Sequence, residues 1–358
     1  MYNFAAGPAC LPEPVLALAR EELFARGEDG AGLLERPFGH PETRRMIDEA
    51  RERLAALLAL PANYHILFLA GGAMQQFAAV PLNLLGPGQT AAYADSGYWA
   101  RRAIAEARRF GQVAVVARAP DTPPLVAPSF EDWRLPPDCA YCHITPNETA
   151  DGIAYAELPD TGAVPLVADA TSCFLAAPVD VSRFGLIYAS AQKNIGPAGM
   201  TVVIVREDLL EREASHAPST WRYRLQAEQG SRVNTPPLVA IHLAGLVFEW
   251  IAVSGGLTFM AEMNRRKGQR LYAAIDGSGG FYRAPVASAS RSLTNVRFHL
   301  HDAALTEPFL AAAEAAGLFH LRGHPQLGGL RASLYNAMPE AGAAALADFL
   351  GEFARRHG

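Results

Sequence analysis

The chain has 358 residues, a length that allows about two domains with cores of their own. Half of the residues are hydrophobic and the formal net charge is -5, which argues against a nucleic-acid partner, because such partners usually require a strongly basic face. No apolar stretch is long enough to cross a bilayer, and residues 1–14 lack the basic and apolar segments of a secretory signal, so we expect a cytoplasmic protein without membrane contact.

The first 260 residues alternate between helical spacing and short apolar runs. Helices are predicted at 13–27, at 41–61 with Pro41 in the first turn, and at 74–85. Strands are predicted at 64–72, 90–97, 112–117, 139–145, 164–172, 186–192 and 201–207. Strands that alternate with helices indicate an α/β domain with a mostly parallel, seven-stranded sheet covered on both faces.

The rest of the chain has a different pattern. Residues 235–276 indicate one or two long helices, and strand patterns then alternate with helices at 304–316 and 340–358 without the regular parallel crossovers. We therefore expect a large domain at 16–259, a smaller α+β domain at 260–358, and an N-terminal arm, 1–15, that packs with the small domain.

Lysine is rare in this chain. Lys193 and Lys267 are the only lysines among 31 basic residues, and the rest are arginines. A lysine can lose its proton in apolar surroundings and condense with a carbonyl, which an arginine cannot do. The neighbours of Lys193 are small and uncharged, which favours a partly buried, chemically active amine. The alternative is that the chain came to use arginine almost everywhere and kept this lysine by chance. Lys267 lies in an arginine-rich stretch, where we expect a solvated helix face.

The cysteines do not form a metal-binding pattern. Cys139 and Cys142 make a CxxC motif on a predicted strand, but no second pair follows it, so we expect reduced thiols and no metal.

Four predicted strands end in residues that suit a ligand, and in open parallel sheets ligands bind beyond the carboxyl ends of the strands. Gly71 and Gly72 precede a helix whose amides suit a phosphate, Asp169 is a carboxylate after an apolar run, and Lys193 ends another strand. The fourth strand ends in a polar cluster at 147–149. An anion site, a buried acid and a desolvated amine together match the needs of pyridoxal phosphate.

Longer motifs resemble a known family. The chain is similar to phosphoserine aminotransferases, which are fold-type-I enzymes of aminotransferase class V, from YNFAAGPACLP at its start to EFARRHG at its end. The motifs that carry the resemblance are DSGYWA, PNETADGIA, YASAQKNIGPAGMTVVIVRED, VNTPPLVA and GGLRASLYNAMP.

The resemblance assigns roles to particular residues. It implies that Lys193 forms the Schiff base with the cofactor and moves the substrate proton, and that Asp169 pairs with the pyridine nitrogen. Arg331 would bind the substrate α-carboxylate. It further implies a ring-stacking Trp99, a Thr149 near the phenolic oxygen, a phosphate site at Gln192 and the amides of Ala73 and Met74, and Asn234 and Thr235 reaching the cofactor of the other subunit in a homodimer.

The substrate side departs from the family pattern. The family has basic residues where this chain has Phe38 and Gly39, and an arginine where Pro325 follows the retained His324. Either His40 or a neighbouring arginine, Arg44 or Arg45, meets the substrate phosphate instead, or the enzyme accepts a non-phosphorylated acid, as glyoxylate, alanine and serine transaminases of the same class do.

The resemblance implies transamination between L-glutamate and 3-phosphohydroxypyruvate in serine biosynthesis. A phosphorylated threonine analogue of vitamin B6 (pyridoxine) synthesis is a further expected substrate.

Overall fold

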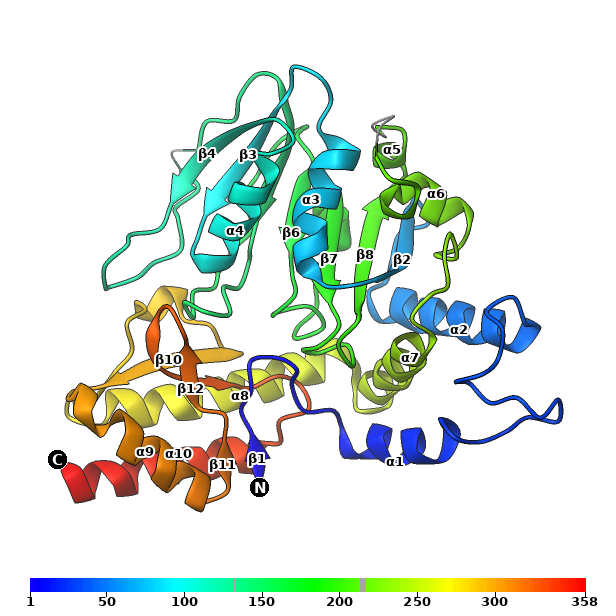
Figure 1. Cartoon of the computed structure of the whole chain (residues 1–358). Helices are drawn as coiled ribbons and strands as arrows, with labels where there is room; N and C mark the ends of the chain where they lie inside the picture. The colour runs from blue at the N-terminus through cyan, green and yellow to red at the C-terminus, as the bar shows by residue number, and fades with distance from the viewer. Residues whose placement is uncertain (132, 213–216) are drawn as a thin grey trace.

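The computed structural model describes residues 1–131, 133–212 and 217–358. Its centre is a seven-stranded sheet with the strand order β2-β8-β7-β6-β5-β3-β4 (Figure 1). β8 runs antiparallel to both of its neighbours, and the other neighbouring pairs are parallel. The mostly parallel sheet predicted from the sequence is therefore confirmed. The strands are β2 (Tyr64–Ala70), β3 (Thr90–Asp95), β4 (Gln112–Arg118), β5 (Cys139–Ile144), β6 (Leu166–Asp169), β7 (Leu186–Ser190) and β8 (Met200–Arg206).

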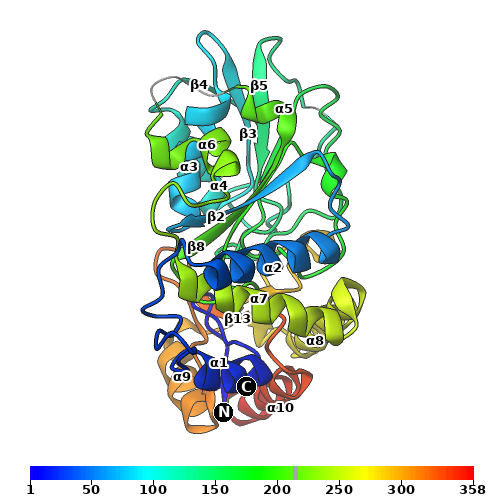
Figure 2. The same ribbon diagram turned by 90° about the vertical axis from the view of Figure 1, so that its right-hand side faces the viewer.

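Helices cover both faces of this sheet because the strands present apolar side chains on both sides. One core lies under α1 (Glu13–Glu22), α2 (Pro41–Leu57) and α7 (Leu238–Val253). The other lies under α3 (Ala73–Leu84), α4 (Tyr98–Ala107), α5 (Glu207–Leu210) and α6 (Tyr223–Glu228), and Figure 2 shows the two layers. The sequence pattern did not single out α4, which begins after Gly97 and places Trp99 in its first turn.

A second, antiparallel sheet lies below the first in Figure 1, with the strand order β12-β13-β10-β9. Its strands are β9 (Tyr282–Arg283), β10 (Asn295–Leu300), β12 (Arg322–His324) and β13 (Gly328–Ser333). Its core includes the edge-to-face aromatic contacts that Phe309 makes with Phe298 and Phe353. The accompanying helices are α8 (Gly256–Asp276), α9 (Thr306–Ala315) and α10 (Glu340–His357).

The N-terminal arm joins this second core. β1 (Tyr2–Asn3) pairs in parallel with β11 (Leu318–Phe319), and Phe4 is buried in the same cluster as the small sheet. We propose that the chain divides into the arm at 1–15, the large domain at 16–259 and the small domain at 260–358. Helix α8 links the two cores, since its first half packs on the large core and its second half on the small one.

A sharp bend separates the two long helices of the 235–276 region. Gly255 adopts a left-handed conformation with φ of 109°, and the axes of α7 and α8 are bent by 84°. Within the described part of the chain, no single helix is long and apolar enough to span a membrane, and α7 and α8 reach that threshold only as a bent pair.

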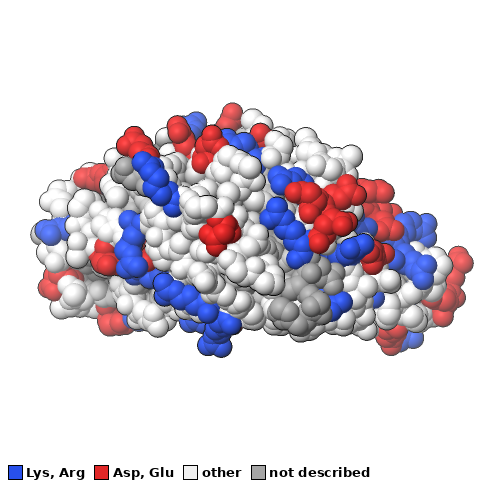
Figure 3. All heavy atoms as spheres, turned by 90° about the horizontal axis from the view of Figure 1, so that it is seen from above, with Lys and Arg blue, Asp and Glu red and all other residues white. Residues whose placement is uncertain are grey.

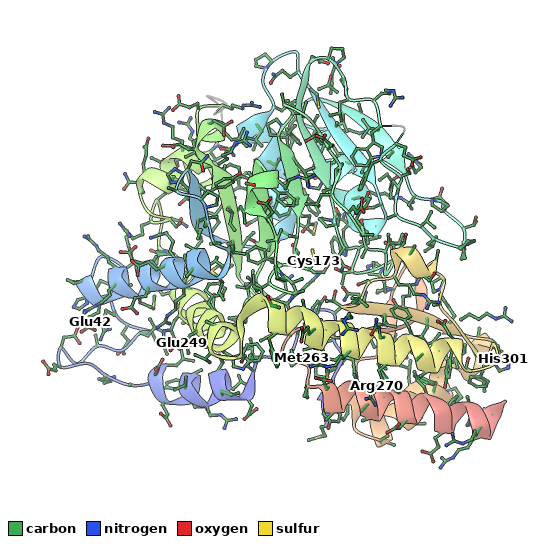
Figure 4. All side chains as sticks on the ribbon, turned by 180° about the vertical axis from the view of Figure 1, so that it is seen from behind. Glu42, Cys173, Glu249, Met263, Arg270 and His301 are labelled. Carbon is green, nitrogen blue, oxygen red and sulfur yellow. The ribbon has the colours of Figure 1, made fainter. Side chains whose placement is uncertain are left out.

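The prediction for Lys267 was wrong. Its side chain is only 1% exposed, and its Nζ donates hydrogen bonds to the carbonyl oxygens of Tyr335 (2.8 Å) and Met338 (2.9 Å). Burial lowers the pKa of this amine from 10.5 to about 7. Helical spacing could not reveal this, because the segment between β13 and α10 that covers Lys267 is about 70 residues away in sequence (Figure 4 shows α8 above α10).

Charge is mixed on the one face of the molecule that Figure 3 shows. On the face seen in Figure 3, acidic and basic side chains lie next to one another. This agrees with the mild net charge of -5.

Candidate active site

A cavity of about 410 Å³ lies beyond the carboxyl ends of β5, β6 and β7, between the large sheet and β12 and β13 of the small one. Residues from both domains and from the N-terminal arm line it. The structure thus brings most of the sequence-predicted site residues into one place. Those that line the cavity are Ala73, Met74, Trp99, Thr149, Asp169, Gln192, Lys193, His324 and Arg331.

Lys193 follows β7 in a turn of small residues and is 8% exposed. Its Nζ donates a hydrogen bond of 2.5 Å to Oγ1 of Thr149. Burial lowers the pKa of this amine from 10.5 to about 8, an effect that the nearby charge of Asp169 opposes and that of Arg331 reinforces. Near neutral pH, a substantial fraction of the amine is therefore unprotonated and nucleophilic.

Asp169 ends β6 and is 5% exposed. Its Oδ1 accepts hydrogen bonds from the backbone N–H (3.1 Å) and the hydroxyl (2.5 Å) of Thr171. Burial raises the pKa of the carboxyl group, while Thr171 and Lys193 act in the opposite direction. A cation placed in the cavity would therefore hold this group as a carboxylate. Thr171 was missed from the sequence, although a hydroxyl residue two positions after an aspartate is a common turn partner.

The start of α3 offers an anion site. Its N-cap is Gly72, which makes no side-chain hydrogen bond to the helix, so the amides of Ala73 and Met74 remain available at the positive end of the helix dipole. Gln192 lines the same end of the cavity, and its Oε1 accepts a hydrogen bond from Ser190. That bond directs the amide NH₂ of Gln192 toward other partners.

Two acidic side chains hold the start of α4, and with it Trp99, in place. Glu148 is fully buried and accepts hydrogen bonds from the backbone N–H groups of Trp99 (3.0 Å) and Ala100 (2.9 Å). Asp151 accepts one from the N–H of Tyr98 (2.8 Å). Together they cap α4, whose own N-cap residue is a glycine. Burial and the neighbouring Asp151 raise the pKa of Glu148 to about 8.

Arg331 and His324 enter the cavity from the small sheet. Arg331 lies on β13, and its Nη1 donates to the carbonyl oxygen of Thr149 (3.3 Å). Burial lowers its pKa, so an anion that pairs with it would be strongly favoured. His324, on β12, has its ring centroid 4.3 Å from that of Tyr98.

Three predicted residues lie outside this cavity. Asn234 and Thr235 are exposed, and Asn234 lines a separate cavity of about 180 Å³. His40 is the N-cap of α2, where its Nδ1 accepts from the N–H of Glu42 (3.3 Å) and its Nε2 lies 3.6 Å from Asp29. Within its own chain, His40 is thus not part of the site.

The residues that line the cavity fit pyridoxal phosphate. The start of α3 has no side-chain cap, which suits the phosphate, and the amine of Lys193 suits the aldehyde. Among the described residues, both hydrogen bonds to Asp169 fall on Oδ1, which leaves Oδ2 for the ring nitrogen. The fold and the site therefore define a pyridoxal phosphate-dependent enzyme with the fold-type-I architecture.

Comparison with known proteins agrees with this class. The model of the aminotransferase class-V family matches residues 1–346, and the chain belongs to that family. Its relatives include the phosphoserine aminotransferase of Acidithiobacillus ferrooxidans, which is 51% identical over 358 residues, covering 100% of this chain and 99% of the relative.

Solved structures give the same result. The phosphoserine aminotransferase from Bacillus circulans subsp. alkalophilus superposes with a TM-score of 0.96 at 42% identity, over 100% of this chain and 99% of that one. The pyridoxal phosphate-bound phosphoserine aminotransferase from Trichomonas vaginalis superposes with a TM-score of 0.93 at 36% identity, over 98% and 99%.

Proposed function

We propose that the protein transfers an amino group between L-glutamate and 3-phosphohydroxypyruvate, as a phosphoserine transaminase of serine biosynthesis. The observation that carries this proposal is the meeting of Lys193, Asp169 and Arg331 in one cavity, in a chain about half identical to phosphoserine aminotransferases over its full length. The related reading, a transaminase for non-phosphorylated acids, is not favoured by these relatives.

The chemistry divides between the cofactor and the protein. When bound, pyridoxal phosphate supplies an aldehyde for amines and a ring that withdraws electrons from the substrate α-carbon. Lys193, with its lowered pKa, would take the proton from the substrate α-carbon and deliver it to the cofactor carbon that is bonded to the substrate nitrogen. Asp169 would pair as a carboxylate with the protonated ring nitrogen, and Arg331 would bind both oxygens of the substrate carboxylate.

Further residues position these groups. Trp99, which the cap by Glu148 holds in place, would stack on the cofactor ring. Thr149 accepts a hydrogen bond from Lys193, and the side chain of Gln192 and the amides of Ala73 and Met74 would bind the cofactor phosphate.

The enzyme acts as a homodimer with shared active sites. Asn234 and Thr235 are exposed outside the cavity of their own chain, which leaves them available for the cofactor phosphate of the partner. We place this enzyme in the cytoplasm.

Two experiments test the proposal. Lys193→Ala should abolish the visible absorbance of the lysine-bound cofactor, and an unchanged band would show that another group holds it. A steady-state panel of 3-phosphohydroxypyruvate, glyoxylate, pyruvate and oxaloacetate against glutamate, alanine and serine tests the substrate. A preference for an unphosphorylated acceptor by more than about tenfold, or about 1.4 kcal/mol, would refute phosphoserine transamination.

A further inference from the structure

A second arginine stands directly beside Arg331. β10 pairs antiparallel with β13, and Arg297 is the register partner of Arg331. Residues directly opposite each other in an antiparallel pair point to the same face with Cβ atoms about 5 Å apart. Because Arg331 lines the cofactor cavity, Arg297 presents a second positive charge on the same side of the small sheet.

The guanidinium of Arg297 reaches the turn between β12 and β13. Its Nη2 donates a hydrogen bond of 2.9 Å to the carbonyl oxygen of Leu327. This turn also carries Pro325, the position at which the resembled family has an arginine. The charge missing from the turn is thus replaced by a side chain that arrives from the neighbouring strand.

Arg297 is poorly satisfied by the protein itself. Its Nε is buried and has no hydrogen-bond partner among the described residues. Burial lowers its pKa, and the charge that opposes this effect is that of Asp151, whose carboxylate already accepts the Tyr98 N–H. A half-buried guanidinium with one unpaired donor favours an anionic ligand.

The side chain is also fixed against the active-site loop. A Cβ built on Gly152 would lie 3.1 Å from the Cβ of Arg297, so the loop that supplies Thr149 packs on the base of the arginine. A cavity of about 290 Å³ beside it, distinct from the cofactor cavity that Arg331 lines, is lined by Arg297, Gly97 and Asp151.

We propose that Arg297 determines substrate specificity by binding the side-chain phosphate, while Arg331 binds the carboxylate. This inference rests on the proposed phosphoserine transaminase function. Two guanidinium groups from directly opposed strand positions match a three-carbon acid that carries a carboxylate at one end and a phosphate ester at the other. A shorter, monoanionic substrate has no group to reach the second arginine.

The test compares Arg297→Met with wild type, using the cofactor-loaded enzyme. The kcat/KM for L-phosphoserine should fall about ten- to a hundredfold, whereas that for L-alanine should change less than about twofold, because one charge-assisted contact is lost from the phosphate alone. Titration calorimetry with 3-phosphoglycerate, which has both anionic groups but no amine, should show a matching rise in Kd. Glycerate serves as the reference ligand without the phosphate.

The matched control is Arg322→Met. Arg322 lies on β12 of the same sheet, but it is exposed and paired with Glu307 (2.6 Å), so its loss should not change the phosphoserine to alanine ratio. Arg297→Lys keeps the positive charge but lacks the paired N–H donors of a guanidinium, so it should recover part of the preference for phosphoserine over alanine. If the methionine variant does not fold, the lysine and glutamine variants decide by the same ratio.

The outcomes separate the two claims. If Arg297→Met keeps the wild-type ratio of kcat/KM for phosphoserine over alanine within about twofold, Arg297 does not bind the phosphate. The proposed function then stays in place. A wild type without any such preference overturns the proposed function and this inference with it.

Discussion

The acidity of Lys193 is the property on which its proposed role depends, and it can be measured directly. With a pKa of about 8, about a quarter of the amine is neutral at pH 7.5, against about one part in a thousand for a lysine at 10.5. The cavity therefore increases the nucleophilic fraction roughly two-hundredfold. Because the Asp169 charge raises this pKa and the Arg331 charge lowers it, Asp169→Asn should lower the pKa further and Arg331→Met should raise it.

The assay is competitive labelling of the cofactor-free protein with trace acetic anhydride across the pH range, followed by mass spectrometry of the lysine peptides. The chain is suited to it because its only lysines are Lys193 and Lys267. Lys267 is 1% exposed and should label only on unfolding, so it serves as an internal control for an intact fold. A Lys193 titration near pH 10.5, or shifts opposite to those stated for the two variants, would refute the reasoning.

Three further predictions follow from the packing around the site. Glu148→Ala removes the acceptors of the Trp99 and Ala100 N–H groups, so we expect a loss of about 1 to 3 kcal/mol in unfolding free energy and a weaker visible circular dichroism of the bound cofactor; unchanged spectra would contradict this. Gly97→Ala would place Cβ 2.5 Å from a carboxylate oxygen of the adjacent loop and should lower the melting temperature, whereas Gly39→Ala, with nothing within 4 Å, should not; equal melting temperatures would count against the packing. Lys267 keeps its proton up to about pH 10.5 in the unfolded chain but only up to about pH 7 in the folded one. Between these two pH values the unfolded chain binds more protons, so the contribution of Lys267 to the unfolding free energy should rise with pH, by up to about 1.4 kcal/mol per pH unit. Urea unfolding of wild type and Lys267→Met at several pH values checks this, and a pH-independent difference between them would disprove it.

The two lysines show how far local sequence can be trusted. Small, uncharged neighbours correctly indicated that Lys193 is largely buried, in the turn that follows the central strand β7. The arginine-rich neighbours of Lys267 indicated solvent, and the structure buries it. On a helix, adjacent residues point in different directions, so the composition around a position does not determine what covers it.

The sequence by itself determined the parallel sheet and the edge at which Asp169, Thr149 and Lys193 meet, because the carboxyl ends of parallel strands share one side of a sheet. Only the tertiary structure decided what surrounds them. Glu148 caps a helix 48 residues earlier in the chain, and Arg297 stands opposite Arg331 through the pairing of β10 with β13. Such contacts join segments whose local patterns are independent of each other, so they exist only once the chain has folded and brought those surfaces together.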